Sequence, residues 1–318
     1  MNTNKSSNEI AISCQSLHKA YGQVQAIRDI NFEVKKGEIF GIIGPDGAGK
    51  TTLFRTLTTL ILADAGTATV DGFDIVKDYT EIRKRVGYMP GRFSLYQDLT
   101  VEENLEFFAT VFDTTVAENY ELIKDIYQQI EPFKNRRAGK LSGGMKQKLA
   151  LCCALIHKPS VLFLDEPTTG VDPVSRKEFW GMLKKLKTDG ITILVSTPYM
   201  DEASLCDRIA LIQQGQFLTI DSPKGIVNRY PNKLLSVEAD NMHQLLQELR
   251  SNKMTANCFA FGDKHHVSIS KESIEKHHSM NEIIRIIQAN LVAKNYNNCM
   301  ITEIQPGIED CFMQLSQQ

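Results

Sequence analysis

The sequence predicts an α/β fold, in which helices cover a mostly parallel β-sheet, followed by a small C-terminal α+β domain. Two observations predict it. Short apolar runs alternate with helical patterns from Ala11 to about Ile220, and buried strands separated by helices pack as a parallel sheet with helices on its faces. The pattern changes near Tyr230, after which the segments follow the order β-α-β-β-α-β, which is the split βαβ arrangement.

We therefore expect one domain at residues 9–230, with a helical insertion at about 98–158, and a second, small domain at 232–318. The length of 318 residues, the 42% of hydrophobic residues and the 23% of charged residues fit a globular protein of this size. The net charge of −2 argues against a general nucleic-acid binder. No apolar run approaches the ~20 residues of a membrane span, and the polar start MNTNKSSNEI has no apolar signal core.

The seven cysteines are scattered and form no C-x-x-C pair, which favours a reducing compartment over a disulfide scaffold or a zinc site. Two histidine pairs in the small domain, His265–His266 and His277–His278, lack supporting carboxylate or thiol spacing. We interpret them as polar surface or hairpin residues, with a metal site as the alternative.

The individual elements are predicted from periodicity and composition, and we take them in chain order. In the first domain, strands are expected at 31–34, 39–43, 161–165 and 191–197, a hairpin at 66–75, and helices at 51–61, 101–112, 118–133, 146–156 and 175–186. In the second domain, strands are expected at 234–239, 257–263, 265–271 and 298–304, and helices at 241–250, 280–293 and 308–315.

The stretch GPDGAGKT matches the phosphate-binding pattern G-x-x-x-x-G-K-[ST] in full, between a predicted strand and a predicted helix. Its glycines allow the backbone N–H groups to curl around a phosphate, and the helix start adds a positive dipole end. Lys50 supplies a cation for the outer phosphates, and the hydroxyl of Thr51 is a Mg²⁺ ligand. The nucleotide-binding residues predicted here are Gly44, Pro45, Asp46, Gly47, Ala48, Gly49, Lys50, Thr51 and Thr52.

The stretch VLFLDEPT brings two carboxylates to the end of a buried strand. Asp165 is the candidate that holds Mg²⁺ through water. Glu166 is the candidate catalytic residue, because it can orient or deprotonate the attacking water. An acidic turn without chemistry is the alternative, and the neighbouring phosphate loop disfavours it.

A third motif, LSGGMKQK, places Ser142, Gly143 and Gly144 before a helical run, where their hydroxyl and N–H groups can bind another anion. With LSGG between the phosphate loop and VLFLDEP, residues 9–228 resemble the ABC ATPases. That resemblance implies a P-loop core with an antiparallel β subdomain. It also implies a pair of ATPase domains that enclose two MgATP molecules, each between one domain's phosphate loop and the other domain's signature.

Further positions match the family one at a time. Tyr21 in HKAYGQ corresponds to the aromatic residue that stacks on adenine, with a half-buried structural tyrosine as the alternative. Asp172 in TTGVDP corresponds to a position near the dimer interface. VSRKEFW and YMDEA resemble the exporter branch that serves drugs, antibiotics or Na⁺, and EIQPGIEDCFMQL resembles the C-terminal extension of that branch.

The resemblance implies an ATP-binding subunit that works with ABC-2-type membrane permease subunits and with a second ATPase subunit or domain. A heterodimer is favoured and a homodimer is possible. We expect a cytoplasmic protein, peripheral on the inner face of the cell membrane, with no nucleic-acid partner. By family analogy, Arg92, Phe93 and Tyr96 in RFSLYQDL are the candidate permease contacts.

Two positions depart from the family pattern. Pro198 in STPYMDEA stands where the family has a histidine that reaches the γ-phosphate, and proline cannot replace that contact. Gly91 in GYMPG stands where the family has a glutamine that senses Mg²⁺ and water, and Gln97 lies six residues too late to replace it. We therefore expect that the chain binds ATP but hydrolyses it slowly at its own site. Alternatively, a water or Tyr199 compensates and hydrolysis is ordinary.

Two other functions remain open. One is an ABC ATPase that acts on ribosomes or DNA, although the single ATPase unit and the lack of a long charged linker or coiled coil argue against it. The other is a regulatory pseudo-ATPase that binds nucleotide without turnover.

Overall fold

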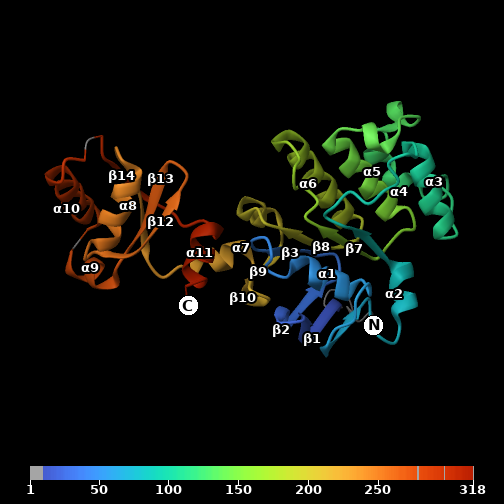
Figure 1. Cartoon of the computed structure of the whole chain (residues 1–318), viewed down its shortest axis with the longest axis horizontal. Coiled ribbons are helices and arrows are strands. Elements are labelled where there is room, and N and C mark those ends of the chain that lie inside the picture. The colour runs from blue at the N-terminus through green and yellow to red at the C-terminus, as the bar shows by residue number, and fades with distance from the viewer. Residues whose placement is uncertain (1–9, 278, 297, 318) are drawn as a thin grey trace, which may run out of the picture. The chain divides into compact units, whose positions relative to one another are not determined.

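The computed structural model describes residues 10–277, 279–296 and 298–317. The chain divides into two compact units, one ending at Pro223 and the other beginning at Lys224, and Figure 1 shows the elements of both. Each unit has its own sheets and helices.

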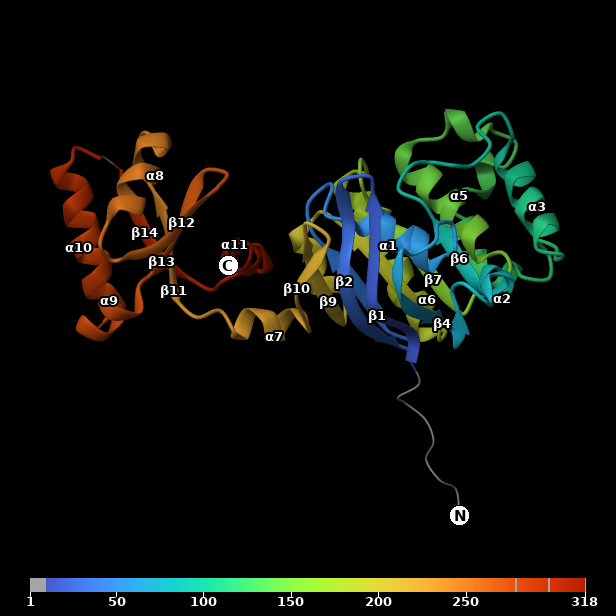
Figure 2. The same ribbon diagram turned by 60° about the horizontal axis from the view of Figure 1, so that its bottom comes forward.

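The first unit contains an antiparallel sheet with the strand order β2-β1-β4-β5. Its long strands lie side by side in Figure 2. The hairpin predicted at 66–75 is confirmed, because β4 and β5 pair antiparallel through Val70 and Phe73. The strands of this sheet are β1 (Ile10–Tyr21), β2 (Val24–Lys35), β4 (Ala65–Val70) and β5 (Phe73–Asp74).

The second sheet of this unit has the order β10-β9-β3-β8-β7-β6. All neighbours pair in parallel except β10, which runs antiparallel to β9. The predicted mostly parallel sheet is therefore confirmed. Its strands are β3 (Ile39–Ile43), β6 (Val86–Met89), β7 (Val161–Asp165), β8 (Thr192–Thr197), β9 (Arg208–Gln213) and β10 (Gln216–Asp221).

The register of the parallel sheet brings the predicted functional segments to one edge. Ile43 pairs with Thr197, and Asp165 pairs with Ser196. The carboxyl ends of β3, β7 and β8 are therefore level, and ligands bind at that edge in open α/β sheets.

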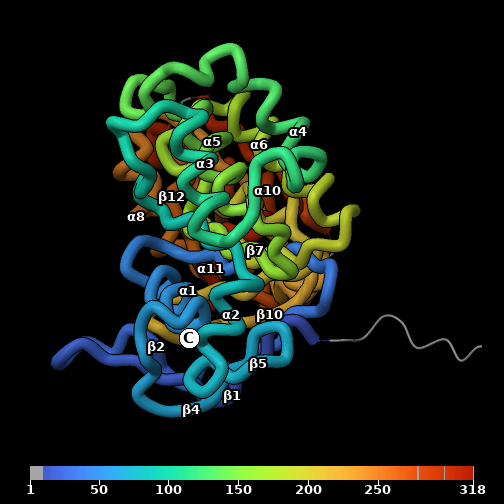
Figure 3. The backbone as a smooth tube through the Cα atoms, turned by 90° about the vertical axis from the view of Figure 1, so that its right-hand side faces the viewer, coloured from blue at the N-terminus to red at the C-terminus, as the bar shows by residue number. Residues whose placement is uncertain are grey.

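Helices complete the first unit. Figure 3 shows α3, α4 and α5 at one end of the unit and the antiparallel sheet at the other, with β7 between them. The helices are α1 (Lys50–Leu57), α2 (Tyr79–Arg85), α3 (Val101–Val111), α4 (Tyr120–Tyr127), α5 (Gly143–Leu155) and α6 (Pro173–Thr188), with 3₁₀ turns at Glu131–Phe133, Ala138–Lys140 and Met200–Leu205.

Two helices are shorter in the structure than the sequence predicts. The helix expected at 51–61 ends at Leu57, because Thr59 has a left-handed φ of 62° and the N–H of Leu60 turns back to the carbonyl of Arg55 (2.8 Å). Leu60, counted as part of the apolar face, is 54% exposed. The helix expected at 118–133 ends at Tyr127, and a separate 3₁₀ turn at 131–133 follows.

The second unit has a four-stranded antiparallel sheet with the order β12-β13-β11-β14. Because β13 lies between β11 and β12, this is the predicted split βαβ arrangement. Leu235, Val237 and Val267 from the sheet share a core with Leu245 of α8 and Ile287 of α10. The elements are α7 (Pro223–Asn228), β11 (Lys233–Glu238), α8 (Met242–Ser251), β12 (Thr255–Phe261), β13 (Lys264–Ile269), α9 (Lys271–Lys276), α10 (Met280–Ala293), β14 (Met300–Ile304) and α11 (Ile308–Leu315).

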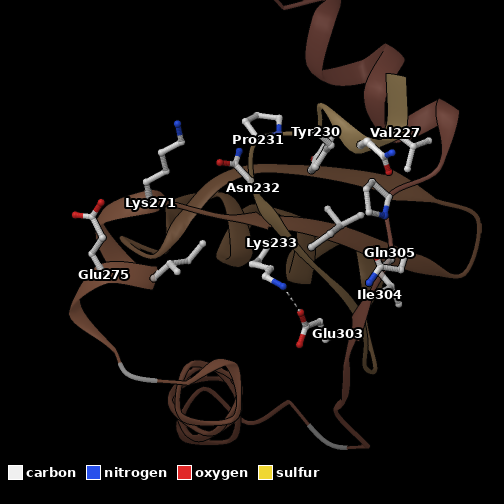
Figure 4. Close-up of a pocket in the computed structure, with 14 residues that line it drawn as sticks. Val227, Tyr230, Pro231, Asn232, Lys233, Lys271, Glu275, Glu303, Ile304 and Gln305 are labelled. Carbon is white, nitrogen blue, oxygen red and sulfur yellow. Dashed lines mark hydrogen bonds and ion pairs between the residues drawn. The ribbon is translucent and has the colours of Figure 1, made fainter. Parts of the chain in front are cut away.

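A cavity of about 500 Å³ lies within the second unit. Figure 4 shows residues from α7, β11, α9 and β14 around it, with Lys233 paired to Glu303 at 3.2 Å. The chain's last helix is attached to this unit by side-chain contacts. Asp310 Oδ1 lies 2.7 Å from Nδ1 of His266, and Asn257 donates to Gln314 (3.0 Å).

Candidate nucleotide-binding site

The predicted phosphate loop follows β3 and leads into α1. Gly49 stands at the start of α1 with a left-handed φ of 106°, and a Cβ atom there would lie 2.2 Å from the carbonyl oxygen of Ala26. At Gly44, a Cβ atom would lie 2.2 Å from the carbonyl oxygen of Ile212. These two glycines are therefore required by backbone that passes against the loop on both sides.

Lys50 is directed into the loop rather than into solvent. Its Nζ donates to the carbonyl oxygens of Gly44 (2.8 Å) and Pro45 (2.9 Å), and it lies 3.1 Å from Oε1 of Glu166. Lys50 is only 3% exposed. The predicted phosphate cation and the predicted catalytic carboxylate are thus in direct contact.

A cavity of about 410 Å³ opens at this loop. Of the residues predicted from the sequence, it is lined by Gly47, Gly49, Lys50, Thr51, Thr52 and Glu166. Its other lining residues, which the sequence analysis did not identify, are Gln23, Val24, Gln25, Ala26, Arg28 and Gln214. The remaining predicted nucleotide and metal residues of this half of the site, Tyr21, Gly44, Pro45, Asp46, Ala48 and Asp165, do not line it.

Asp165 lies at the end of β7 and is 2% exposed. The hydroxyl of Ser196 donates to its Oδ1 (2.7 Å), and the N–H of Glu166 donates to the same hydroxyl (3.0 Å) and to the carbonyl of Ser196 (3.1 Å). Glu166 has a left-handed φ of 51°. Ser196 therefore holds both carboxylate residues in place, although its role depends on the β7–β8 register and was not visible in the sequence.

A Mg²⁺ ion usually takes one or two protein ligands and completes its shell with water and substrate phosphates. Thr51 in the first turn of α1 and Asp165 at the end of β7 can provide one hydroxyl and one carboxylate oxygen, so the donor types fit. Among the described residues, no cluster of three or more His, Cys, Asp or Glu side chains could hold a metal by itself.

Three of the paired histidines of the second unit have protein partners. His265 Nε2 lies 2.7 Å from the carbonyl of Met242, His266 contacts Asp310, and His277 Nδ1 lies 3.2 Å from Glu282 Oε1. His278 lies outside the described residues. His265 and His266 lie on the β12–β13 hairpin, as the hairpin interpretation expects, but His265 is buried rather than on the surface.

Tyr21, the predicted adenine-stacking residue, stands at the end of β1 and is 48% exposed. The Nζ of Lys19 lies 5.7 Å from the centre of its ring. The Tyr21 ring therefore has an accessible aromatic surface. The chain continues from Tyr21 to Val24 and Gln25, which line the cavity.

The turn after β8, which carries Pro198, is anchored by a buried carboxylate. Glu202 is 1% exposed and accepts hydrogen bonds from Thr168 (2.8 Å) and Thr197 (2.6 Å). The guanidinium of Arg176 lies 4.1 Å from the centre of the Tyr199 ring, and its Nε lies 3.6 Å from Glu202. This network joins the turn after Glu166 to the turn at 197–199.

Gly91 follows β6 and faces the end of β7. A Cβ atom at this position would lie 2.9 Å from the carbonyl oxygen of Asp165 and 3.6 Å from Cβ of Glu166. The glycine thus allows a close approach of the backbone to the two carboxylate residues. The side chain of Gln97 lies elsewhere, against Gly139, whose N–H donates to the Gln97 carbonyl (2.9 Å).

The LSGG segment forms the start of α5 and does not line the cavity. Ser142 caps the helix by accepting from the N–H of Met145 (3.4 Å). A Cβ atom at Gly144 would lie 2.8 Å from the hydroxyl oxygen of Ser175, while Asp172 caps α6 through the N–H groups of Val174 and Ser175. The signature and the 168–173 turn therefore pack together on a surface separate from the phosphate loop.

A third cavity, of about 440 Å³, is mostly apolar and lies between the end of β6 and the helical insertion. Met89, Leu95, Phe108, Phe112 and His157 are among its lining residues.

Within the described residues, none of the helices has both the length and the apolar character that a membrane crossing requires.

Known proteins are similar to this chain in sequence. Residues 27–169 match the family described as ABC transporter. The chain is 41% identical over 217 residues to the probable multidrug ABC transporter ATP-binding protein YbhF of Escherichia coli strain K12, covering 68% of this chain but only 38% of that protein. It is 30% identical over 315 residues to the linearmycin resistance ATP-binding protein LnrL of Bacillus subtilis strain 168, covering 96% of this chain and 98% of that protein.

Solved structures agree with the sequence comparison. cbiO1 from Clostridium perfringens, part of the ABC transporter complex cbiONQ, superimposes with a TM-score of 0.63 at 26% identity, over 70% of this chain and 92% of that one. The dimeric bacterial ABC transporter cassette MJ0796 gives a TM-score of 0.61 at 26% identity, over 66% of this chain and 98% of the cassette. The matched fold is that of the first unit, with the second unit as an additional C-terminal region.

Proposed function

Because this chain belongs to the family of ATP-binding subunits of ABC transporters, we propose that it binds MgATP and drives a separate membrane permease of an exporter. The observation that carries the proposal is the loop from Gly44 to Thr51, where Lys50 is fixed beside Glu166 at the end of a parallel sheet. The near full-length similarity to LnrL, named for linearmycin resistance, favours the exporter branch for drugs, antibiotics or Na⁺. The daunorubicin resistance ATP-binding protein DrrA2 of Streptomyces coeruleorubidus, 38% identical over 222 residues, supports the same branch.

Each predicted residue then has a role in binding. The backbone of the loop, from Gly44 to Thr52, holds the phosphates, and Tyr21 stacks on the adenine. Thr51 and Asp165 hold the Mg²⁺ ion that accompanies the nucleotide. Glu166 orients or deprotonates the attacking water once nucleotide has drawn Lys50 away from it.

The chain's own site is proposed to turn over slowly, because Gly91 and Pro198 replace the side chains that usually complete the reacting geometry. Tyr199 is a poor substitute, since its ring is covered by the Arg176 guanidinium. Gln97 is directed toward Gly139 instead of the strand edge. Loss of a contact made mainly in the transition state typically lowers the rate by about 10²–10³.

The LSGG segment is proposed to complete a nucleotide site on a second ATPase subunit. Ser142 and the first turn of α5 lie on a surface apart from the chain's own phosphate loop, so they can meet a triphosphate held by a partner. A partner with ordinary catalytic residues would make the pair asymmetric. We therefore favour a heterodimer over a homodimer.

The permease is proposed to contact the apolar cavity beside the helical insertion. Tyr96 is 51% exposed, and its ring packs edge to face against the ring of Phe107, with the ring centroids 4.8 Å apart. Such exposed apolar surface next to a cavity is typical of a protein interface. Arg92 and Phe93 lie in the same segment as Tyr96 and are proposed to contact the permease as well. Through these contacts the chain would be held, as a peripheral protein, at the inner face of the membrane.

The first test of the function is direct binding of MgATP to the purified chain, measured by calorimetry, with Lys50→Met as the matched variant. We expect saturable binding that Lys50→Met weakens by at least about tenfold, because a charge-assisted contact contributes about 1.5–3 kcal/mol. A purified, folded chain without affinity for MgATP would contradict the proposal. Recovery with nucleic acid rather than with a multi-span membrane protein would instead favour the ribosome or DNA function.

A second test separates the subunit from a regulatory pseudo-ATPase. In a reconstituted pair with its ATPase partner, Ser142→Ala in this chain should strongly reduce the turnover of the partner's site. Ser204→Ala, which removes an exposed hydroxyl bonded to Asp201, is the control and should leave turnover unchanged. Equal activity of the Ser142→Ala and Ser204→Ala pairs would favour the regulator.

A further inference from the structure

Arg28 is a cavity residue that the family motifs do not explain. It lies on β2 and lines the cavity of about 410 Å³ together with Gly47, Lys50 and Thr51. Its backbone N–H donates to the carbonyl of Gly215 (2.8 Å), and the N–H of Gly215 donates to the carbonyl of Ala48 (3.0 Å). A chain of two hydrogen bonds therefore connects Arg28 to the phosphate loop.

The packing fixes this position further. A Cβ atom on Gly49 would lie 2.2 Å from the carbonyl oxygen of Ala26, and a Cβ atom on Gly215 would lie 2.8 Å from the same oxygen. Strand β2 at residues 26–28 is thus pressed against the loop without intervening side chains. Arg28 stays at the cavity wall because its backbone has no room to move away.

The charges of the cavity leave Arg28 without an acidic partner. Its charged lining residues in the described part of the chain are Arg28, Lys50 and Glu166. Lys50 and Glu166 pair with each other at 3.1 Å. The Nε atom of Arg28 is buried and has no hydrogen-bond acceptor among the described residues. A buried donor without an acceptor is costly, so an anion in the cavity would be stabilised by it.

We infer that Arg28 is a second cationic contact, besides Lys50, for the phosphate groups of the bound nucleotide. This inference rests on the proposed function, because it names a further residue of the same site. The planar guanidinium offers several N–H donors in a fork that matches phosphate oxygens, whereas Lys50 acts as a single point charge. Arg28 would also be used for ADP, because ADP retains the α- and β-phosphates.

The inference is tested by calorimetric binding of MgATP and MgADP to the full chain and to two variants. Arg28→Met removes the charge at similar length, and Arg28→Lys keeps the charge but removes the fork. Arg136→Met is the control, because this substitution removes the same charge outside the cavity. Arg136 lies in the helical insertion, with its guanidinium 4.6 Å from the centre of the Phe133 ring. Thermal unfolding of each variant shows whether it folds.

We expect Arg28→Met to weaken both nucleotides by about 10- to 100-fold, Arg28→Lys by a smaller factor, and Arg136→Met by less than about twofold. If the unaltered chain binds MgATP and Arg28→Met binds it equally well, the inference is wrong while the proposed function stands. If the unaltered chain does not bind MgATP, the proposed function fails and the inference fails with it.

Discussion

The ammonium group of Lys50 lies 3.1 Å from Oε1 of Glu166, so the predicted phosphate cation is already paired with the predicted catalytic carboxylate. Both side chains are largely shielded, with 2% and 21% exposure. A nucleotide must therefore compete with Glu166 for Lys50. In the proposed function, the free energy of nucleotide binding and the release of Glu166, the predicted catalytic residue, are linked through this one ion pair.

Glu166→Gln should consequently tighten MgATP binding rather than weaken it. The substitution removes the competing negative charge and its repulsion of the phosphates, which we expect to favour binding by on the order of 1 kcal/mol, or about fivefold. Calorimetry at one salt concentration measures the effect. Unchanged or weaker binding by Glu166→Gln would show that the ion pair does not compete with nucleotide.

Pro198→His should raise ATP turnover by the chain alone. The turn at 197–199 is held by Thr197, Glu202 and Arg176, so an imidazole placed at 198 would extend from an anchored backbone. We expect an increase of at least about tenfold, since one transition-state contact is worth about 10²–10³. Pro198→Ala, which removes the ring without supplying a donor, is the control. Equal turnover by the two variants would mean that position 198 does not limit the rate.

Gly91→Gln should not restore activity by itself. A Cβ atom at 91 would lie 2.9 Å from the carbonyl of Asp165, so the backbone around the carboxylates must shift. We expect a loss of about 1–3 kcal/mol in the free energy of unfolding, as for other overpacked sites. Gly181→Gln, at an exposed position of helix α6 where a Cβ atom meets nothing within 4 Å, should be neutral or stabilising. Restored turnover without destabilisation would disprove this account of Gly91.

His157 should make stability depend on pH. Burial lowers the pKa of His157, and the ring stacks on Phe112 with centroids 3.8 Å apart. The unfolded chain then binds the proton more tightly than the folded chain, so this residue lowers the free energy of unfolding as pH falls below about 6.5. His157→Gln, which stays neutral and can still donate to Val86, should lose less stability between pH 7 and pH 5 in urea titrations. Parallel pH profiles would refute the assignment.

The sequence predicted the elements whose patterns are local. Residues 39–43, 161–165 and 191–197 are short apolar runs, and all three are strands of the parallel sheet. The end of α1 was placed too late, because the apolar spacing of Leu60 continues past the turn at Thr58 and Thr59. The left-handed backbone at Thr59 ended the helix, and periodicity does not show it.

The candidate site was predictable only as far as its motifs extend. Lys50, Thr51 and Glu166 carry motif positions and meet in one cavity. Ser196 and Arg28 escaped prediction, since their roles depend on strand register and on hydrogen bonds between segments far apart in sequence. The packing of Gly91 under Asp165 likewise follows from tertiary contacts. The absence of the usual glutamine was visible in the sequence. The close packing of backbone against Gly91, which leaves little room for a side chain, was not.

The central claim is that this chain binds MgATP yet hydrolyses it slowly without a partner. It is tested most directly by steady-state turnover of the purified chain at saturating MgATP, compared with Glu166→Gln under conditions in which both are shown to bind. We predict a low rate for the unaltered chain, which Glu166→Gln lowers further. Rapid hydrolysis by the chain alone, abolished in Glu166→Gln, would contradict the claim and show that Gly91 and Pro198 leave the site fully competent.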